Sequence, residues 1–196
     1  MTLAFPLWLD VSFQRAAEGA GLEIYLNRTT CYPKHMNPKE LAAHKSAPKR
    51  MATLPSFKAM KRGKLPKPLH KMGGPRLQGT EVVEVSDTHR AIFMWRDGEQ
   101  RTDRAFYAYL FCVLETGELH PLFEMHFHPS HKGLHAKLPC KTQYDYASRF
   151  LPGAPELGIK SPPDLDPNNE LHRNQLIDIF CSSCGIKIGS EGGLWN

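Results

Sequence analysis

Cysteine is scarce in this sequence, and its few copies do not form a disulfide framework. Five cysteines are scattered over 196 residues, and an odd, widely spaced set is not the pattern of a small secreted protein. No run approaches the roughly 20 apolar residues that a membrane-spanning helix needs, and the N-terminus lacks the basic start of a secretion signal. We therefore expect a cytoplasmic protein without a membrane partner.

Acidic side chains are nearly missing from one long segment. From Lys34 to Arg76 the chain has twelve Lys or Arg and one acid, Glu40, so this segment carries +11 while the whole chain carries +5. The same stretch is rich in proline and has no regular apolar period. We expect residues 33–76 to form a basic, proline-rich insertion with at most short helices, such as one at Pro38 to His44.

The central third of the chain predicts an antiparallel meander. Four runs rich in β-branched and aromatic residues are separated by turn residues: Glu81 to Ser86, Arg90 to Arg96, Ala105 to Leu114 and Leu119 to His128. Residues 106–113 are apolar on both faces, as a covered central strand should be. A hydrophobic fraction of 41% suits one domain, residues 1–196. We predict an α+β fold whose antiparallel sheet has about four to six strands, with helices packed on one face.

The flanking regions predict smaller elements. Asp10 or Ser12 can cap an early helix, and residues 22–26 alternate like a strand. Residues 152–168 are proline-rich and predict a surface loop. A helix near Asn169 to Ile179 and an alternating, strand-like tail over residues 177–188 complete the expected fold.

A histidine block spans the end of the predicted strand Leu119 to His128 and the residues just after it. Four of the ten histidines lie between His126 and His135. In an extended strand His120, Leu122, Glu124, His126 and His128 share one face. Two imidazoles at i and i+2 can bind one metal ion, and the following turn can supply His131 or His135. The alternative is a half-exposed strand and loop whose histidines hydrogen-bond to water.

The C-terminal Cys181-Ser182-Ser183-Cys184-Gly185 has the form of half a zinc knuckle. A structural zinc ion needs four ligands, and no second Cys-x-x-Cys exists. The missing pair has to come from another part of the chain, and the candidates are Cys31, Cys140, His126, His128, His131, His135 and His172. We predict a metal site of Cys181 and Cys184 with His126 and His128, and zinc as the cofactor that such a site would hold. Buried thiols without a metal are the main alternative, and a redox pair is a weaker one.

The basic segment predicts a partner of opposite charge. Seven of its cations recur among prolines and glycines: Lys58, Lys61, Arg62, Lys64, Lys67, Lys71 and Arg76. Such a run can follow a phosphate backbone and bind in a salt-dependent way. We expect nucleic acid, RNA more than DNA, as the partner. A protein with an acidic surface and a merely solvated loop are the alternatives.

One passage resembles a known family. Residues 73–98 begin with Gly73-Gly74-Pro75-Arg76 and run through Arg90 to Asp97-Gly98. They resemble the passage of small RelE-like and HigB-like ribonuclease toxins in which a basic loop leads into strands that hold an arginine. The resemblance covers about an eighth of the chain and implies a toxin-like, RNA-cleaving activity. The two N-terminal helices usual in that family are not evident.

These features together predict a nucleic-acid-binding protein that acts as a ribonuclease. His131 and His135 are the expected acid–base pair, because imidazoles titrate near neutral pH. Lys132 or Arg90 would stabilise the phosphate charge, and with a bound metal Glu124 would be the base. The competing hypothesis is a non-enzymatic, zinc-stabilised interaction or inhibitor protein of a mobile genetic element, which docks on nucleic acid or a nucleoprotein complex.

Overall fold

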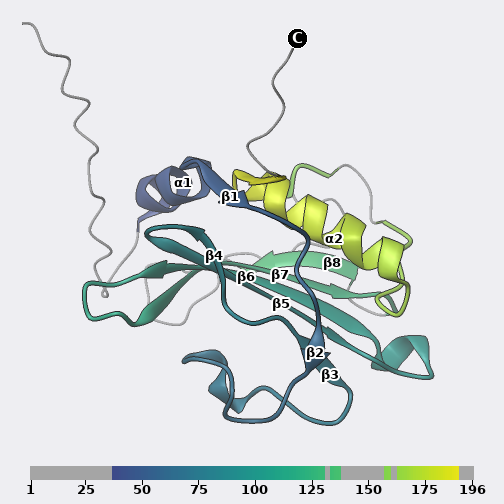
Figure 1. Ribbon diagram of the computed structural model, residues 1–196. Helices are drawn as coiled ribbons and strands as arrows, with labels where there is room; N and C mark the ends of the chain where they lie inside the picture. The colour runs from purple at the N-terminus through teal and green to yellow at the C-terminus, as the bar shows by residue number, and fades with distance from the viewer. Residues whose placement is uncertain (1–36, 131–132, 138–156, 160–162, 190–196) are drawn as a thin grey trace, which may run out of the picture.

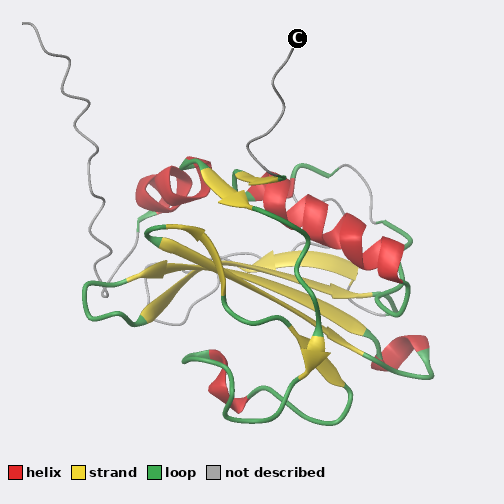
Figure 2. Cartoon of the chain, viewed as in Figure 1, coloured by secondary structure: helices red, strands yellow, loops and turns green. Residues whose placement is uncertain are grey.

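The computed structural model describes residues 37–130, 133–137, 157–159 and 163–189 of the chain. These residues form an α+β fold with a seven-stranded antiparallel sheet, two α-helices and a small two-stranded parallel sheet (Figures 1 and 2). The elements in chain order are α1 (Pro38–Ser46), β1 (Lys49–Met51), β2 (Lys58–Ala59), η1 (Leu69–Lys71), β3 (Leu77–Gly79), β4 (Val83–Ser86), β5 (His89–Arg96), η2 (Arg101–Asp103), β6 (Ala105–Val113), β7 (Leu119–His128), β8 (Gly133–Lys137), α2 (Glu170–Ser183) and β9 (Ile186–Ile188).

The four runs predicted as strands form β4 to β7. β7 has the predicted bounds, and the others differ from them by one or two residues at an end. The order in the large sheet is β2-β3-β5-β6-β7-β8, with β4 also pairing with β5. β6 is buried along nearly its whole length and lies inside the sheet. The sheet has more strands than expected because short β2, β3 and β8 extend it.

The two faces of the sheet are covered by different parts of the chain. Figure 1 shows α1, β1 and α2 over one face and the segment between β2 and β3 beneath the other. On the first face Phe180 of α2 packs edge-on against Phe93 of β5, with ring centroids 5.4 Å apart. On the second face Leu65 and Leu69 pack in a separate apolar cluster with residues of β5 and β6. The sheet therefore separates two cores.

The segment predicted as a basic insertion is built into the fold wherever the structure describes it. Residues 37–76 contribute α1, β1, β2 and η1, and Leu41 and Met51 are buried in the core beneath α2. In the proline-rich residues 152–168, Leu157 and Leu165 are buried in the same core. The helix and strand predicted within residues 10–26 lie outside the described residues.

The C-terminal region corrects one expectation. α2 continues to Ser183 instead of ending near Ile179. The strand-like tail predicted for residues 177–188 is therefore wrong for residues 177–183, and only Ile186–Ile188 form a strand, β9. Asn169 accepts hydrogen bonds from the first-turn amides, and Gly185, at φ +65°, ends the helix. Within the described residues neither helix combines the length and apolar character needed to cross a bilayer.

A buried histidine pair joins α1 to the sheet. Nδ1 of His44 lies 3.0 Å from Nε2 of His89 on β5, and both residues are only 4% exposed. Nδ1 of His89 lies 2.9 Å from the Ser86 hydroxyl. Burial, assisted by the nearby Lys49, lowers the pKa of His89 from 6.5 to about 3. His89 is therefore neutral in the folded protein at every physiological pH.

Acid is expected to destabilise the protein through His89. In the unfolded chain His89 binds a proton near pH 6.5, whereas in the folded chain it binds one only near pH 3. The free energy of unfolding therefore falls as the pH drops from 6.5 to 3. Between pH 7 and pH 5 this one group should cost about 2 kcal/mol. Urea unfolding at both pH values measures the loss. His89→Gln, which cannot titrate, should remove most of it, and an unchanged pH dependence in this variant would contradict the assignment.

Candidate functional site

Three histidines meet on the sheet face that α2 does not cover. His126 and His128 alternate along β7, and His135 on β8 lies directly opposite His126. Ring centroids are 5.4 Å apart for His126 and His135 and 5.5 Å apart for His128 and His135. One nitrogen atom from each ring lies within 4.8 Å of the other two. We call His126, His128 and His135 the histidine triad.

Strand pairing explains why these side chains converge. Residues at i and i+2 of a strand point to the same face, and directly opposed residues of an antiparallel pair have Cβ atoms about 5 Å apart. Gly133, at φ +57°, begins β8 opposite His128 and so sets the register that places His135 beside His126. The triad therefore depends on the backbone of a single hairpin.

A carboxylate lies at one side of the triad. Oε2 of Glu124 is 3.2 Å from Nε2 of His126, and both residues are 7% exposed. This carboxylate and the ring nitrogen form an ion pair only when His126 is protonated. Glu124 thus lies beside His126 at the edge of the triad.

Two tyrosines of β6 enclose the triad. The ring of Tyr107 lies 5.1 Å from that of His126 and 5.7 Å from that of His128, and Tyr109 lies 5.6 Å from His126. Burial raises the pKa of Tyr107, with an opposing effect of the positive charge on Arg96. The Tyr107 hydroxyl is therefore protonated at neutral pH and can donate a hydrogen bond.

The triad is compatible with a bound metal ion. Zinc–nitrogen bonds of about 2.0–2.1 Å place tetrahedral nitrogen ligands roughly 3.4 Å apart. A spread of 4.8 Å closes to that value when the rings move by about 1 Å. Three imidazoles leave the fourth position of a tetrahedral ion for water or substrate.

A bulge in β7 changes which residues share the triad's face. Leu110 pairs with Phe123 and Phe111 with Pro121, so Leu122 is an extra residue in β7. The parity predicted from His128 back to His120 therefore breaks at Leu122, which is buried in the core beneath α2. Glu124, His126 and His128 share a face as predicted, whereas the placement of His120 and Leu122 with them is wrong.

The structure does not bring the cysteine pair to the histidines. Cys181 lies in the last turn of α2 and Cys184 caps it, and both are buried in the core beneath α2, across the sheet from the triad. Burial raises the pKa of Cys181 to about 12 and raises that of Cys184 strongly. Because a metal binds the thiolate, these burial effects oppose a metal site at Cys181 and Cys184.

The residues predicted to act in catalysis do not all lie at the histidine triad. His135 joins the triad, whereas His131 and Lys132 lie outside the described residues. Arg90 lies toward the far end of β5, where Nη1 donates to the Ser86 and His89 carbonyl oxygens at 2.7 and 2.9 Å. Nη2 pairs with Glu84 at 2.8 Å. Arg90 thus holds the β4–β5 turn and is not brought to the triad.

The seven predicted phosphate-binding residues are all exposed. They lie in residues 58–76, from β2 to the start of β3, which we call the basic lobe. Lys58 pairs with Glu81 at 2.9 Å and Arg76 with Asp103 at 3.3 Å. The remaining five form no salt bridge with any residue that the structure describes: Lys61, Arg62, Lys64, Lys67 and Lys71.

The basic lobe and the triad lie on the same face of the sheet. Leu65, Leu69 and Met72 of the lobe pack in the cluster that contains Tyr107 and Tyr109. The Tyr109 hydroxyl donates to Sδ of Met72 at 3.7 Å. Because the same two tyrosines contact His126, the lobe and the triad are neighbours on one surface.

The sequence did not indicate that Arg96 and Tyr107 lie close to the histidine triad. Arg96 is exposed at the end of β5 and pairs with Ala105 of β6. The next residue of β6, Phe106, pairs with Phe127 of β7. Continuing this register by one residue places Ala105 opposite His128, so Arg96, Ala105 and His128 lie in one row across three strands. The alternation of the predicted strands contains this information, but it becomes usable only with the strand order and register.

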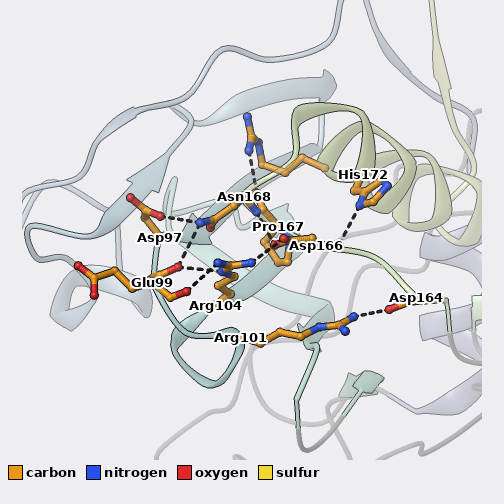
Figure 3. Close-up of polar contacts among 11 residues, drawn as sticks. Asp97, Glu99, Arg101, Arg104, Asp164, Asp166, Pro167, Asn168 and His172 are labelled. Carbon is orange, nitrogen blue, oxygen red and sulfur yellow. Dashed lines mark hydrogen bonds and ion pairs between the residues drawn. The ribbon is translucent and has the colours of Figure 1, made fainter.

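A polar network holds the β5–β6 loop against the segment that precedes α2 (Figure 3). Arg104 donates to Asp166 at 2.6 Å and to the Gly98 and Glu99 carbonyl oxygens at 2.8 Å each. Asn168 donates to Asp97 at 2.9 Å, and Arg101 pairs with Asp164. The loop beside Arg96 is therefore fixed in place.

Comparison with known proteins gives no relative for this chain. No protein-family model matches it, and neither the curated proteins nor the solved structures contain a significant match.

Proposed function

We propose that this protein binds single-stranded nucleic acid, RNA in preference to DNA, on the sheet face that carries the histidine triad, and cleaves it there. The observation that carries the proposal is the shared surface: the exposed basic lobe and the buried triad are joined through Tyr107 and Tyr109. Lysine and arginine side chains supply the sequence-independent affinity for phosphates. Imidazoles next to such a surface supply groups that titrate near neutral pH.

Zinc is the proposed cofactor of the triad, because three neutral imidazoles are a common zinc ligand set. The ion would supply a Lewis acid for a phosphate oxygen and a water that ionises near pH 7. With that hydroxide at hand no separate base is needed, so Glu124 serves to position His126, the residue it contacts. Tyr107 would donate to a phosphate oxygen.

RNA is the proposed polymer because its 2′-hydroxyl lies next to each phosphate. Attack of this oxygen on phosphorus forms one P–O bond and breaks the bond to the 5′-oxygen. The 2′-hydroxyl loses its proton, the leaving 5′-oxygen gains one, and a cyclic phosphate end remains. Attack by water would instead leave an open phosphate end and would also cleave DNA, so the ends of the products distinguish the two routes.

A second function is favoured by the burial of the triad. His126 and His135 are 7% and 4% exposed, which suits an ion that stabilises the fold as well as one that meets a substrate. The protein would then be a zinc-stabilised, non-enzymatic protein that docks on nucleic acid or a nucleoprotein complex, such as an inhibitor from a mobile genetic element. RNA binding without any cleavage by the zinc-loaded protein would favour this function.

Removing three charges from the basic lobe is expected to weaken RNA binding about tenfold or more near physiological salt. The test variant is Lys61→Gln/Lys64→Gln/Lys67→Gln, and all three side chains are exposed. Three lost phosphate contacts should also lower the slope of log affinity against log salt by about 2. Fluorescence anisotropy with a labelled single-stranded RNA, from 50 to 300 mM salt, measures both quantities.

The matched control removes the same charge from the helix side of the molecule. Lys39, Arg50 and Lys187 are exposed on α1, β1 and β9, and their change to Gln should alter affinity by less than about twofold. Equal losses in the two triple variants would show that net charge alone governs binding and would contradict the proposed surface. Melting curves of both variants check that the fold is retained.

A further inference from the structure

A groove opens at the end of the large sheet, between the basic lobe and the β5–β6 loop. Its volume is about 390 Å³. The residues that line it include Gly73, Gly74, Arg76, Arg96, Thr102 and Asp103. Two guanidinium groups therefore border one depression on the protein surface.

The charge of this groove is positive. Arg96 is exposed and forms no ion pair with the described part of the chain. Arg76 pairs with Asp103 at 3.3 Å, and both side chains are about half exposed. One carboxylate faces two guanidiniums, so the lining keeps a net positive charge. Guanidinium groups bind phosphate oxygens in a bidentate manner.

The double glycine allows a close approach between two segments of the basic lobe at the groove. Gly73 and Gly74 have φ values of +147° and +139°, which side chains rarely adopt. A Cβ atom on Gly73 would lie 2.5 Å from the backbone nitrogen of Arg62, so only glycine allows the two segments of the lobe to touch here. This close approach brings the backbone of Lys61 and Arg62 against Gly73, one of the residues that line the groove.

The groove is near the histidine triad. Arg96, Ala105 and His128 lie in one row across β5, β6 and β7, and neighbouring strands are roughly 4.8 Å apart, so the Arg96 and His128 backbones are roughly 10 Å apart. Tyr107 bridges the interval, because its ring contacts His126 and His128 while the charge of Arg96 acts on its hydroxyl. The Arg96 and His128 side chains extend from these backbones on one face of the sheet, so two phosphates of one strand can contact both.

We infer that the Arg76–Arg96 groove binds a backbone phosphate next to the one held at the histidine triad. The inference rests on the proposed function, since it assigns the second phosphate of the same nucleic acid strand. The groove sets the position of the strand, and the triad lies one step along it. The polar network at Arg104 and Asp166 keeps the wall of the groove rigid.

The test compares Arg96→Gln with Lys187→Gln, two variants that each lose one exposed charge. Arg96→Gln should weaken binding of a short single-stranded RNA about fivefold and lower the salt slope by about 1, and Arg96→Lys should recover part of the affinity. Lys187→Gln should bind as the parent protein does. In addition, titration with inorganic phosphate should shift the NMR signals of Gly73, Gly74 and Thr102 in the parent protein but not in Arg96→Gln.

The outcomes separate this inference from the proposed function. If the triple lobe variant loses RNA affinity while Arg96→Gln and its salt slope match the parent, the groove assignment is overturned and the proposed function stands. If no RNA binds at all, the proposed function fails, and phosphate-dependent shifts confined to the groove would still support an anion site there. Shifts that are absent, or spread over all exposed cations, would overturn the site.

Discussion

His135→Ala is expected to lower zinc affinity by more than 100-fold. The triad has only three imidazoles, and one nitrogen from each lies within 4.8 Å of the others. Removing one leaves two ligands, both on β7, and the loss should exceed the roughly 10–100-fold effect of removing an outer hydrogen-bond partner. Glu124→Gln removes the carboxylate that lies next to His126 and leaves all three imidazoles in place, so its expected loss is smaller, about tenfold.

Isothermal titration of the tag-free protein with Zn²⁺, together with its metal content after dialysis, measures these affinities. The matched control is Cys181→Ala/Cys184→Ala, which removes the two thiols buried across the sheet. This variant should retain one zinc ion per chain, although its stability should fall because the core loses two sulfur atoms. Zinc that is lost with the cysteines and kept in His135→Ala would contradict the triad.

The large sheet could be predicted because its signal is local. β7 was predicted with its observed bounds, and strand parity placed Glu124, His126 and His128 on one face. The same alternation placed Leu122 on the wrong face. The bulge at this residue depends on how β6 pairs with β7, which the sequence of β7 alone does not show. The sequence thus predicted that Glu124, His126 and His128 share a face but not how far that face extends.

His135 shows why the grouping of the histidines could be predicted only in part: the sequence offered His131 or His135 as the third member and could not choose between them. Its position opposite His126 follows from the turn before β8 and the register of that hairpin. The Cys-x-x-Cys spacing instead suggested that the C-terminal pair would complete the site. In the structure this spacing lies at the end of α2, where Cys181 and Cys184 face the core. Spacing alone does not distinguish a metal knuckle from the buried last turn of a helix.

The sequence of the basic lobe clearly shows its positive charge but gives little indication of how the lobe folds. Its prolines and sparse apolar residues predicted an extended insertion, but Leu65 and Leu69 are enough to hold it on the sheet. Those contacts attach the lobe to the sheet face that carries Tyr107 and Tyr109, the two tyrosines beside the triad. The charge of a segment can be read from the sequence, whereas its position on the fold follows from tertiary packing.

Lys49→Met is expected to lower the free energy of unfolding by about 3 kcal/mol. Lys49 is 4% exposed, and its ammonium group lies where α1 and α2 both end. It donates to the carbonyl oxygens of Ala47 at 2.7 Å, Cys184 at 2.8 Å and Lys45 at 3.2 Å. These carbonyls belong to helix ends and have no helical amide to pair with.

Two opposing effects decide the size of this loss. Three hydrogen bonds from a charged donor contribute roughly 1.5–3 kcal/mol each, and methionine cannot replace them. Against this, burial lowers the pKa of Lys49 from 10.5 to about 8, which corresponds to about 3 kcal/mol of desolvation cost that methionine would not bear. The hydrogen bonds outweigh that cost, so the net change is destabilising.

The matched control is Arg50→Met, which changes an exposed neighbour on β1 and should change the free energy of unfolding by less than about 1 kcal/mol. Urea unfolding followed by circular dichroism measures both, and equal stabilities of the two variants would show that the helix ends do not depend on Lys49.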